Sequence, residues 1–106
     1  MSDSADLLDQ LLGSLLEDFE RSFRRGLLLL EHTPANLLPA SEQRQFQEQL
    51  RAGLAELEAT RALRAASPSP MAVDMGAMTP WHRLMMKVWT LSFHLRQAGI
   101  VPDGGS

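Results

Sequence analysis

The chain has 106 residues, no cysteine and a formal net charge of −3, with 10 Lys and Arg against 13 Asp and Glu. This length fits one small domain, and the lack of thiols excludes disulfide bonds, thiolate metal sites and a cysteine nucleophile. The acidic balance argues against nucleic acid as the partner, because nucleic-acid-binding domains usually carry a basic surplus.

Targeting signals are not evident in the sequence. The first 20 residues hold six acids and neither Lys nor Arg, whereas a secretory signal begins with a basic region. The longest pure leucine run, Leu27–Leu30, is far shorter than the ~20 apolar residues that cross a bilayer. We therefore expect a cytoplasmic protein without a membrane-spanning segment.

Composition predicts an all-α fold. Residue types that favour strands are scarce, since the chain has three Val, one Ile and no Tyr. Good helix formers, chiefly Leu, Ala, Glu, Gln, Arg and Met, fill the periodic segments instead. We expect a single helical domain over residues 1–106.

Two long helices are predicted in the first two thirds of the chain. One covers about residues 4–31, where large apolar side chains recur every three or four residues and the acids precede the arginines, as the helix dipole favours. Pro34 and Pro39 interrupt the pattern. The second helix covers about residues 41–66, and the short connection predicts an antiparallel hairpin.

Residues 67–78 are predicted to form a flexible loop, because prolines and a glycine punctuate them. Three methionines, Met71, Met75 and Met78, lie in or at the end of this segment. Their thioethers are of a type that binds Cu(I), but flexible Met side chains also suit the sealing of a bundle's end. We favour the second interpretation and expect no cofactor.

A third helix is predicted over about residues 80–98, followed by a short tail, 99–106. Thr79 and Pro80 form a typical helix start, and Gly99 is a typical residue at a helix end. The apolar residues of this helix cover more than half of its circumference, so it must be covered on two sides. We therefore expect a three-helix bundle in which the third helix packs across the hairpin.

Helix lengths predict that part of the bundle stays uncovered. The first helix would be about 42 Å long and the third about 28 Å. The third helix is therefore too short to cover the whole apolar stripe of the hairpin. The uncovered part requires another protein or a second copy of the chain.

Residues His82, Met86, Trp89 and Phe93 follow one edge of the third helix at spacings of 4, 3 and 4. Aromatic and Met side chains are enriched at the centres of protein interfaces. This edge either packs against the first helix or binds a partner, and in the second case Trp89 is partly exposed. Our candidate partner-binding residues are Trp89, Met86, Phe93 and His82, with Leu28 in the Leu27–Leu30 end of the first helix as a further contact.

Catalysis and metal binding find little support in the sequence. The three histidines, His32, His82 and His94, lack the spacing of a helical metal pair and have no carboxylate at a matching position. Neither a nucleophile motif nor a Gly-rich phosphate loop is present. We expect a non-catalytic interaction or adaptor protein with no catalytic residue and no metal site, and no small-molecule ligand is evident from the sequence.

Association with a membrane surface is the alternative function. Arg21, Arg24 and Arg25 form a basic cluster close to Leu28 in the predicted first helix. Such a cluster beside an exposed leucine suits an anionic lipid surface. However, the first half of this helix is acidic, which disfavours such binding.

Two groups of residues resemble a known family. They are Leu15-Leu16-Glu17-Asp18-Phe19 with Leu29-Leu30-Glu31, and Pro80-Trp81-His82-Arg83-Leu84 continuing through Val88-Trp89 to Leu95-Arg96. This pattern resembles a small uncharacterised cyanobacterial family of unknown function, over nearly the whole chain and with a variable middle at residues 59–77. The resemblance implies a cyanobacterial cytoplasmic protein, and it implies no activity, cofactor or catalytic residue.

Overall fold

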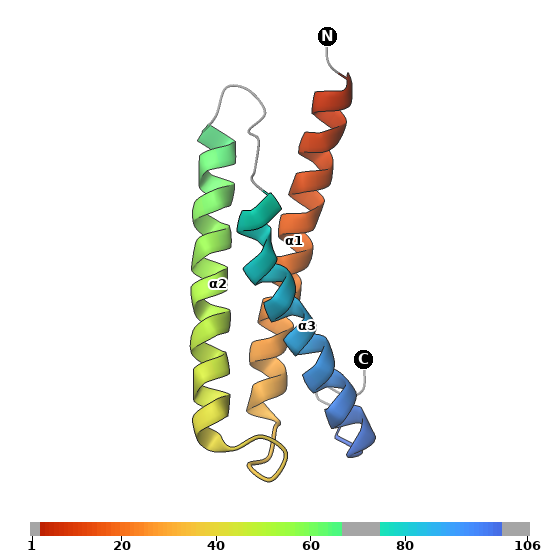
Figure 1. The fold of residues 1–106 in the computed structure, drawn as a ribbon, viewed down its shortest axis with the longest axis vertical. Coiled ribbons are helices and arrows are strands. Elements are labelled where there is room, and N and C mark those ends of the chain that lie inside the picture. The colour runs from red at the N-terminus through yellow and green to blue at the C-terminus, as the bar shows by residue number, and fades with distance from the viewer. Residues whose placement is uncertain (1–2, 67–74, 101–106) are drawn as a thin grey trace.

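A computed structural model of the protein describes residues 3–66 and 75–100. Its helices are α1 (Asp3–Glu31), α2 (Ala40–Ala66) and α3 (Met75–Gln97). Helix α1 packs against both α2 and α3, which confirms the predicted all-α three-helix bundle. Helix α2 runs antiparallel to α1, whereas α3 runs in the same direction as α1 (Figure 1).

The bundle is a slender rod. Its principal extents are 55 × 25 × 20 Å and its radius of gyration is 16.2 Å, against about 13 Å expected for a compact chain of this length. Helix α3 packs mainly on α1 and only slightly on α2. Helix α1 is therefore the central helix, and much of α2 and α3 faces solvent.

The core is a continuous row of apolar side chains from all three helices. Its fully buried members include Leu16, Phe19, Phe23, Leu50, Leu57 and Leu95. The Phe19 and Phe23 rings stack with centroids 6.2 Å apart, and Trp81 lies 5.8 Å from Phe19. Leucine stripes at helical spacing thus form the core, as the periodicity predicts.

Helices α1 and α2 begin and end within one residue of the predicted ranges.

Hydrogen bonds fix the connection between α1 and α2. Thr33 Oγ1 donates to the Leu29 carbonyl at 2.7 Å, and Gln43 Nε2 donates to the carbonyls of Thr33 and Leu38 at 3.0 and 2.8 Å. The Leu29 carbonyl also accepts the His32 N–H at 3.0 Å. The two Gln43 bonds supply donors to backbone carbonyls of the proline-containing turn.

Helix α3 begins at Met75, so the predicted start at Pro80 is wrong, and Pro80 lies inside the helix. Residues 75–78 accordingly belong to this helix and not to a loop. The reason is the burial of Met78, which is 3% exposed and part of the core. A helical turn before Pro80 directs that side chain into the core, and the burial stabilises it. The rest of the predicted loop, 67–74, lies outside the described residues.

Helix α3 ends as the sequence predicts. Gly99 has a φ of 77°, a left-handed conformation that glycine adopts without strain. The Ile100 N–H donates to the Leu95 carbonyl at 2.8 Å, and the Gly99 N–H donates to the Arg96 carbonyl at 3.1 Å. This pair of bonds is the Schellman motif. The predicted tail from residue 101 onward lies outside the described residues.

Candidate partner-binding surface

Three large apolar side chains of α3 point away from the bundle. Met86, Trp89 and Phe93 are 54%, 54% and 52% exposed. At 100° per residue they cluster on one side of the helix, opposite the side that carries Leu84, Val88 and Leu95. We call these three residues the α3 face. Its members are therefore not core side chains, although their residue types would suit a core.

His82 extends the α3 face by one turn. It is exposed, and its ring meets the buried Phe19 ring edge-on, with centroids 5.0 Å apart. The contact with Phe19 holds the imidazole at the border between core and solvent. The structure thus brings four of the five predicted partner-binding residues onto one surface.

Leu28, the fifth predicted residue, lies on α1 near its carboxyl end and is partly buried. Its neighbours Leu29 and Leu30 are only 1% and 2% exposed and belong to the core. The Leu27–Leu30 end of α1 was a candidate contact for a partner, and for Leu29 and Leu30 this expectation is wrong because both are buried. Leu91 and Leu95, in the carboxyl half of α3, belong to the same core cluster.

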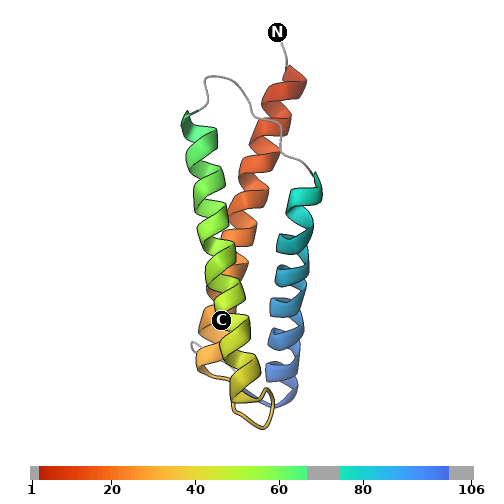
Figure 2. The same ribbon diagram turned by 60° about the vertical axis from the view of Figure 1, so that its left-hand side comes forward.

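The uncovered end of α1 is its amino end. Helix α1 has 29 residues and α3 has 23, so α1 extends past the amino end of α3 (Figures 1 and 2). We call residues 4–11 the α1 overhang. Its leucines, Leu7, Leu8 and Leu11, are 57%, 65% and 52% exposed.

Sequence reasoning missed the overhang, although it predicted the mismatch in helix length. Which end of α1 extends past α3 depends on the level along α1 at which α3 starts. The sequence between α2 and α3 does not determine that level.

Charge differs sharply between these two surfaces. From Met75 to Ile100 the sequence has Arg83, Lys87 and Arg96 but neither Asp nor Glu, whereas the first 20 residues have six acids and no base. Lys87 is engaged within the bundle, since its Nζ donates to Gln49 Oε1 at 2.7 Å and lies 4.5 Å from the centre of the Phe46 ring. Arg83 and Arg96 are exposed and give the surroundings of the α3 face a positive charge.

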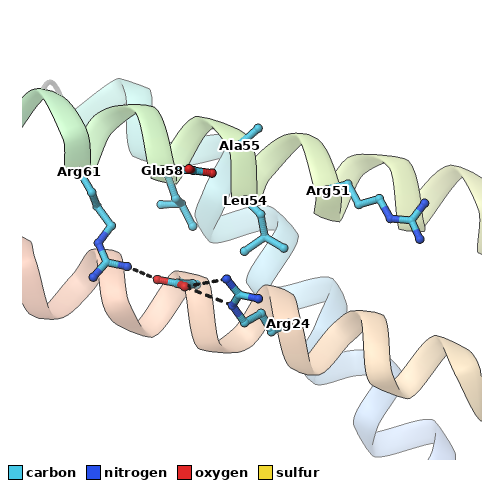
Figure 3. Close-up of a pocket in the computed structure, with 8 residues that line it drawn as sticks. Arg24, Arg51, Leu54, Ala55, Glu58 and Arg61 are labelled. Carbon is cyan, nitrogen blue, oxygen red and sulfur yellow. Dashed lines mark hydrogen bonds and ion pairs between the residues drawn. The ribbon is translucent and has the colours of Figure 1, made fainter.

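A groove of about 530 Å³ lies on the surface between α1 and α2 and is lined by residues of both helices. Glu20 from α1 lies in it and accepts bonds from Arg24 of α1 and Arg61 of α2 (Figure 3). The Glu20 carboxylate therefore has two guanidinium partners, an arrangement that joins the two helices. Partly exposed ion pairs of this kind contribute about 0–1 kcal/mol each to stability.

Within residues 3–66 and 75–100, no group of three or more His, Cys, Asp and Glu side chains could hold a metal ion. His32, His82 and His94 are all exposed. Three methionines were considered as ligands of Cu(I). Met78 is buried in the core, whereas Met71 and the side chain of Met75 lie outside the described part of the chain.

The basic cluster of α1 lies on a charged surface. Arg21 binds Asp18 at 3.3 Å and Arg24 binds Glu20 at 3.0 Å, each one turn along the helix. Arg25 and Leu28 are half-buried. In the part of the chain that the structure describes, no helix is long and apolar enough to cross a membrane.

The fold and this surface define a small all-α protein, a three-helix rod with an exposed aromatic face. A family model described as "Protein of unknown function (DUF2605)" matches residues 2–97, and the chain belongs to that family. The expected family of unknown function is thereby confirmed, whereas its cyanobacterial origin stays a prediction. Comparisons with curated proteins and with solved structures give no match.

Proposed function

We propose that this protein is a non-catalytic interaction module that binds another protein chain through the α3 face. One observation carries the proposal: Met86, Trp89 and Phe93 are each more than half exposed and lie together on one side of α3. Clustered exposed aromatic residues are a typical mark of interaction sites, and Trp is among the residues that most often dominate binding energy.

The surroundings of the α3 face suggest the chemistry of its partner. The face is bordered by His82 and Arg96 and lies on a helix without acidic residues. A complementary surface therefore combines apolar side chains with negative charge. Electrostatic complementarity of this kind speeds association and suppresses wrong partners.

Binding to an anionic membrane surface is the weaker alternative. It would use Arg21, Arg24, Arg25 and Leu28, but Arg21 and Arg24 are already paired with acids of the same helix. Cosedimentation with vesicles of anionic lipid, abolished when all three arginines are replaced by Gln, would favour this alternative over protein binding.

Photo-crosslinking in the native cell tests the proposal. A photoreactive phenylalanine analogue replaces Trp89 in one variant and Leu37 in a control, since Leu37 is 38% exposed and lies in the connection between α1 and α2. We expect defined protein adducts from position 89 and none from position 37. Equal labelling at both positions, or none at position 89, would contradict the proposal.

A further inference from the structure

We propose that the α3 face binds the α1 overhang of a second copy of this chain, so that two copies form an antiparallel dimer. This inference rests on the proposed function, because it names the occupant of the same face. Each copy carries both surfaces, and a two-fold axis then makes the same contact twice.

Apolar complementarity is the first argument. The overhang presents Leu7, Leu8 and Leu11, and the α3 face presents Met86, Trp89 and Phe93, all more than half exposed. A helix with an apolar stripe usually buries it against another element. Both stripes are uncovered because α3 is shorter than α1 and lies on one side of it only.

Charge complementarity is the second argument. It favours a contact between the overhang and the α3 face over a contact between two α3 faces. A contact between two α3 faces would bring together two helices that each carry Arg83 and Arg96 without any acid. The overhang itself carries two acids, Asp6 and Asp9, and no base. Asp9 is paired with Arg64 of α2, whereas Asp6 is exposed. Attraction between Asp6 and the α3 arginines therefore favours a contact of the overhang with α3, whereas two α3 faces would repel each other.

The shape of the rod fits an antiparallel arrangement. The overhang lies at one end of a rod 55 Å long, and the carboxyl half of α3, with Trp89 and Phe93, lies toward the other end (Figure 1). When the second copy is inverted, its overhang comes beside the α3 face of the first copy. The reciprocal contact forms at the same time, and the pair closes without leaving a free surface for a third copy.

The available area suits a dimer of moderate affinity. A large aromatic side chain buries about 150–250 Å² when fully covered, and six half-exposed large side chains offer on the order of 500 Å² per contact. Two contacts give about 1,000 Å², near the lower limit for a specific interface. We therefore expect a dissociation constant in the micromolar range.

Sedimentation equilibrium with the full chain tests the dimer. The wild-type protein should pass from monomer to dimer over the micromolar range. Both Trp89→Ala and Leu11→Ala should weaken dimerisation at least tenfold, because each removes a central apolar contact. Leu37→Ala, at an exposed leucine outside both surfaces, should leave it unchanged. Circular dichroism checks that each variant keeps its helices.

Cysteine crosslinking tests which surfaces meet, since the chain has no cysteine of its own. Gln10→Cys and Thr90→Cys place one thiol on the overhang and one beside the α3 face, both at exposed positions. With a short bismaleimide, a mixture of the two variants should yield crosslinked dimers well above Thr90→Cys alone. Efficient crosslinking of Thr90→Cys with itself would overturn the proposed pairing.

The outcomes separate this inference from the proposed function. If the chain stays monomeric while adducts still form at position 89 with another protein, the α3 face binds a partner and the dimer is excluded. If dimers form but Leu11→Ala leaves them intact, the overhang is not the occupant. If neither dimers nor adducts depend on Trp89, both proposals fall.

Discussion

Trp81 and Trp89 lie two turns apart on α3 and occupy opposite environments. The first is 6% exposed and the second 54% exposed. The Trp81 ring lies 5.8 Å from Phe19, and its Nε1 donates to Glu56 Oε1 at 2.9 Å. Eight residues turn the helix by about 80° beyond two full turns, which moves the second indole off the core-facing side. One tryptophan therefore anchors α3 in the bundle, and the other faces solvent.

Tryptophan fluorescence should distinguish the two indoles. The single-tryptophan variant Trp81→Phe reports on Trp89, and Trp89→Phe reports on Trp81. At low protein concentration, Trp89 should emit at longer wavelength and be quenched more strongly by acrylamide, since water surrounds an exposed indole. Equal quenching of both variants would contradict the burial of Trp81 described above.

Loss of the Glu56 carboxylate should destabilise the bundle through Trp81. Glu56→Ala removes the acceptor of a part-buried hydrogen bond from the Trp81 indole, which should cost about 1 kcal/mol in the free energy of unfolding. Glu56→Gln keeps an acceptor and should cost less. Urea denaturation measures both values. The cost of Glu56→Ala should nearly vanish in a Trp81→Phe background, and a full cost there would assign the effect to another contact of Glu56.

Much of the fold could be predicted because it follows from periodic patterns along single helices. Leu16, Phe19 and Phe23 repeat at helical spacing, and all three are fully buried in the structure. Gly99 ends α3 because a left-handed residue is needed there. Such features depend on local sequence, so a single chain suffices to infer them.

The remaining features depend on how helices align, which local patterns do not determine. The sequence predicts a start of α3 at Pro80, but the burial of Met78 extends the helix to Met75. Exposure of the α3 face was one of two open interpretations, because Trp89 and Phe93 suit either a core or an interface. Leu8 continues the stripe of Leu12 and Leu16, yet it is exposed because α3 does not reach it.

Arg64 should hold the amino half of α1 against α2. Its Nη2 donates to the carbonyl oxygen and to Oδ1 of Asp9, both at 2.8 Å, and the side chain is largely buried. Arg64→Ala should lower the free energy of unfolding by about 1–2 kcal/mol. Hydrogen exchange should speed up at the amides of residues 9–13 and remain unchanged in the carboxyl half of α3.

Arg61→Ala is the matched control for this prediction. Arg61 also joins α2 to α1, through Glu20, but its side chain is 42% exposed. An exposed ion pair contributes about 0–1 kcal/mol and is screened by salt. An equal loss of stability in the two variants would show that burial of Arg64 adds nothing to the contact.

Two glycines should be essential for the close packing of the three helices. A Cβ on Gly26 of α1 would lie 2.8 Å from Val88 Cγ2 and 2.9 Å from Leu50 Cδ1. A Cβ on Gly53 of α2 would lie 2.9 Å from Phe23 Cε2 and 3.1 Å from Leu84 Cδ2. Overpacking of this kind costs about 1–3 kcal/mol, whereas Gly→Ala in a helix otherwise gains about 1 kcal/mol.

Urea denaturation of three alanine variants tests this balance. Gly26→Ala and Gly53→Ala should lower the free energy of unfolding, because the clashing atoms belong to buried side chains with little room to move. Gly13→Ala should raise it by up to about 1 kcal/mol, since the atoms nearest to a Cβ there belong to the Arg64 guanidinium and lie at an ordinary contact distance of 3.5 Å. If all three variants were more stable than the wild type, the helices would not approach as closely at Gly26 and Gly53 as described here.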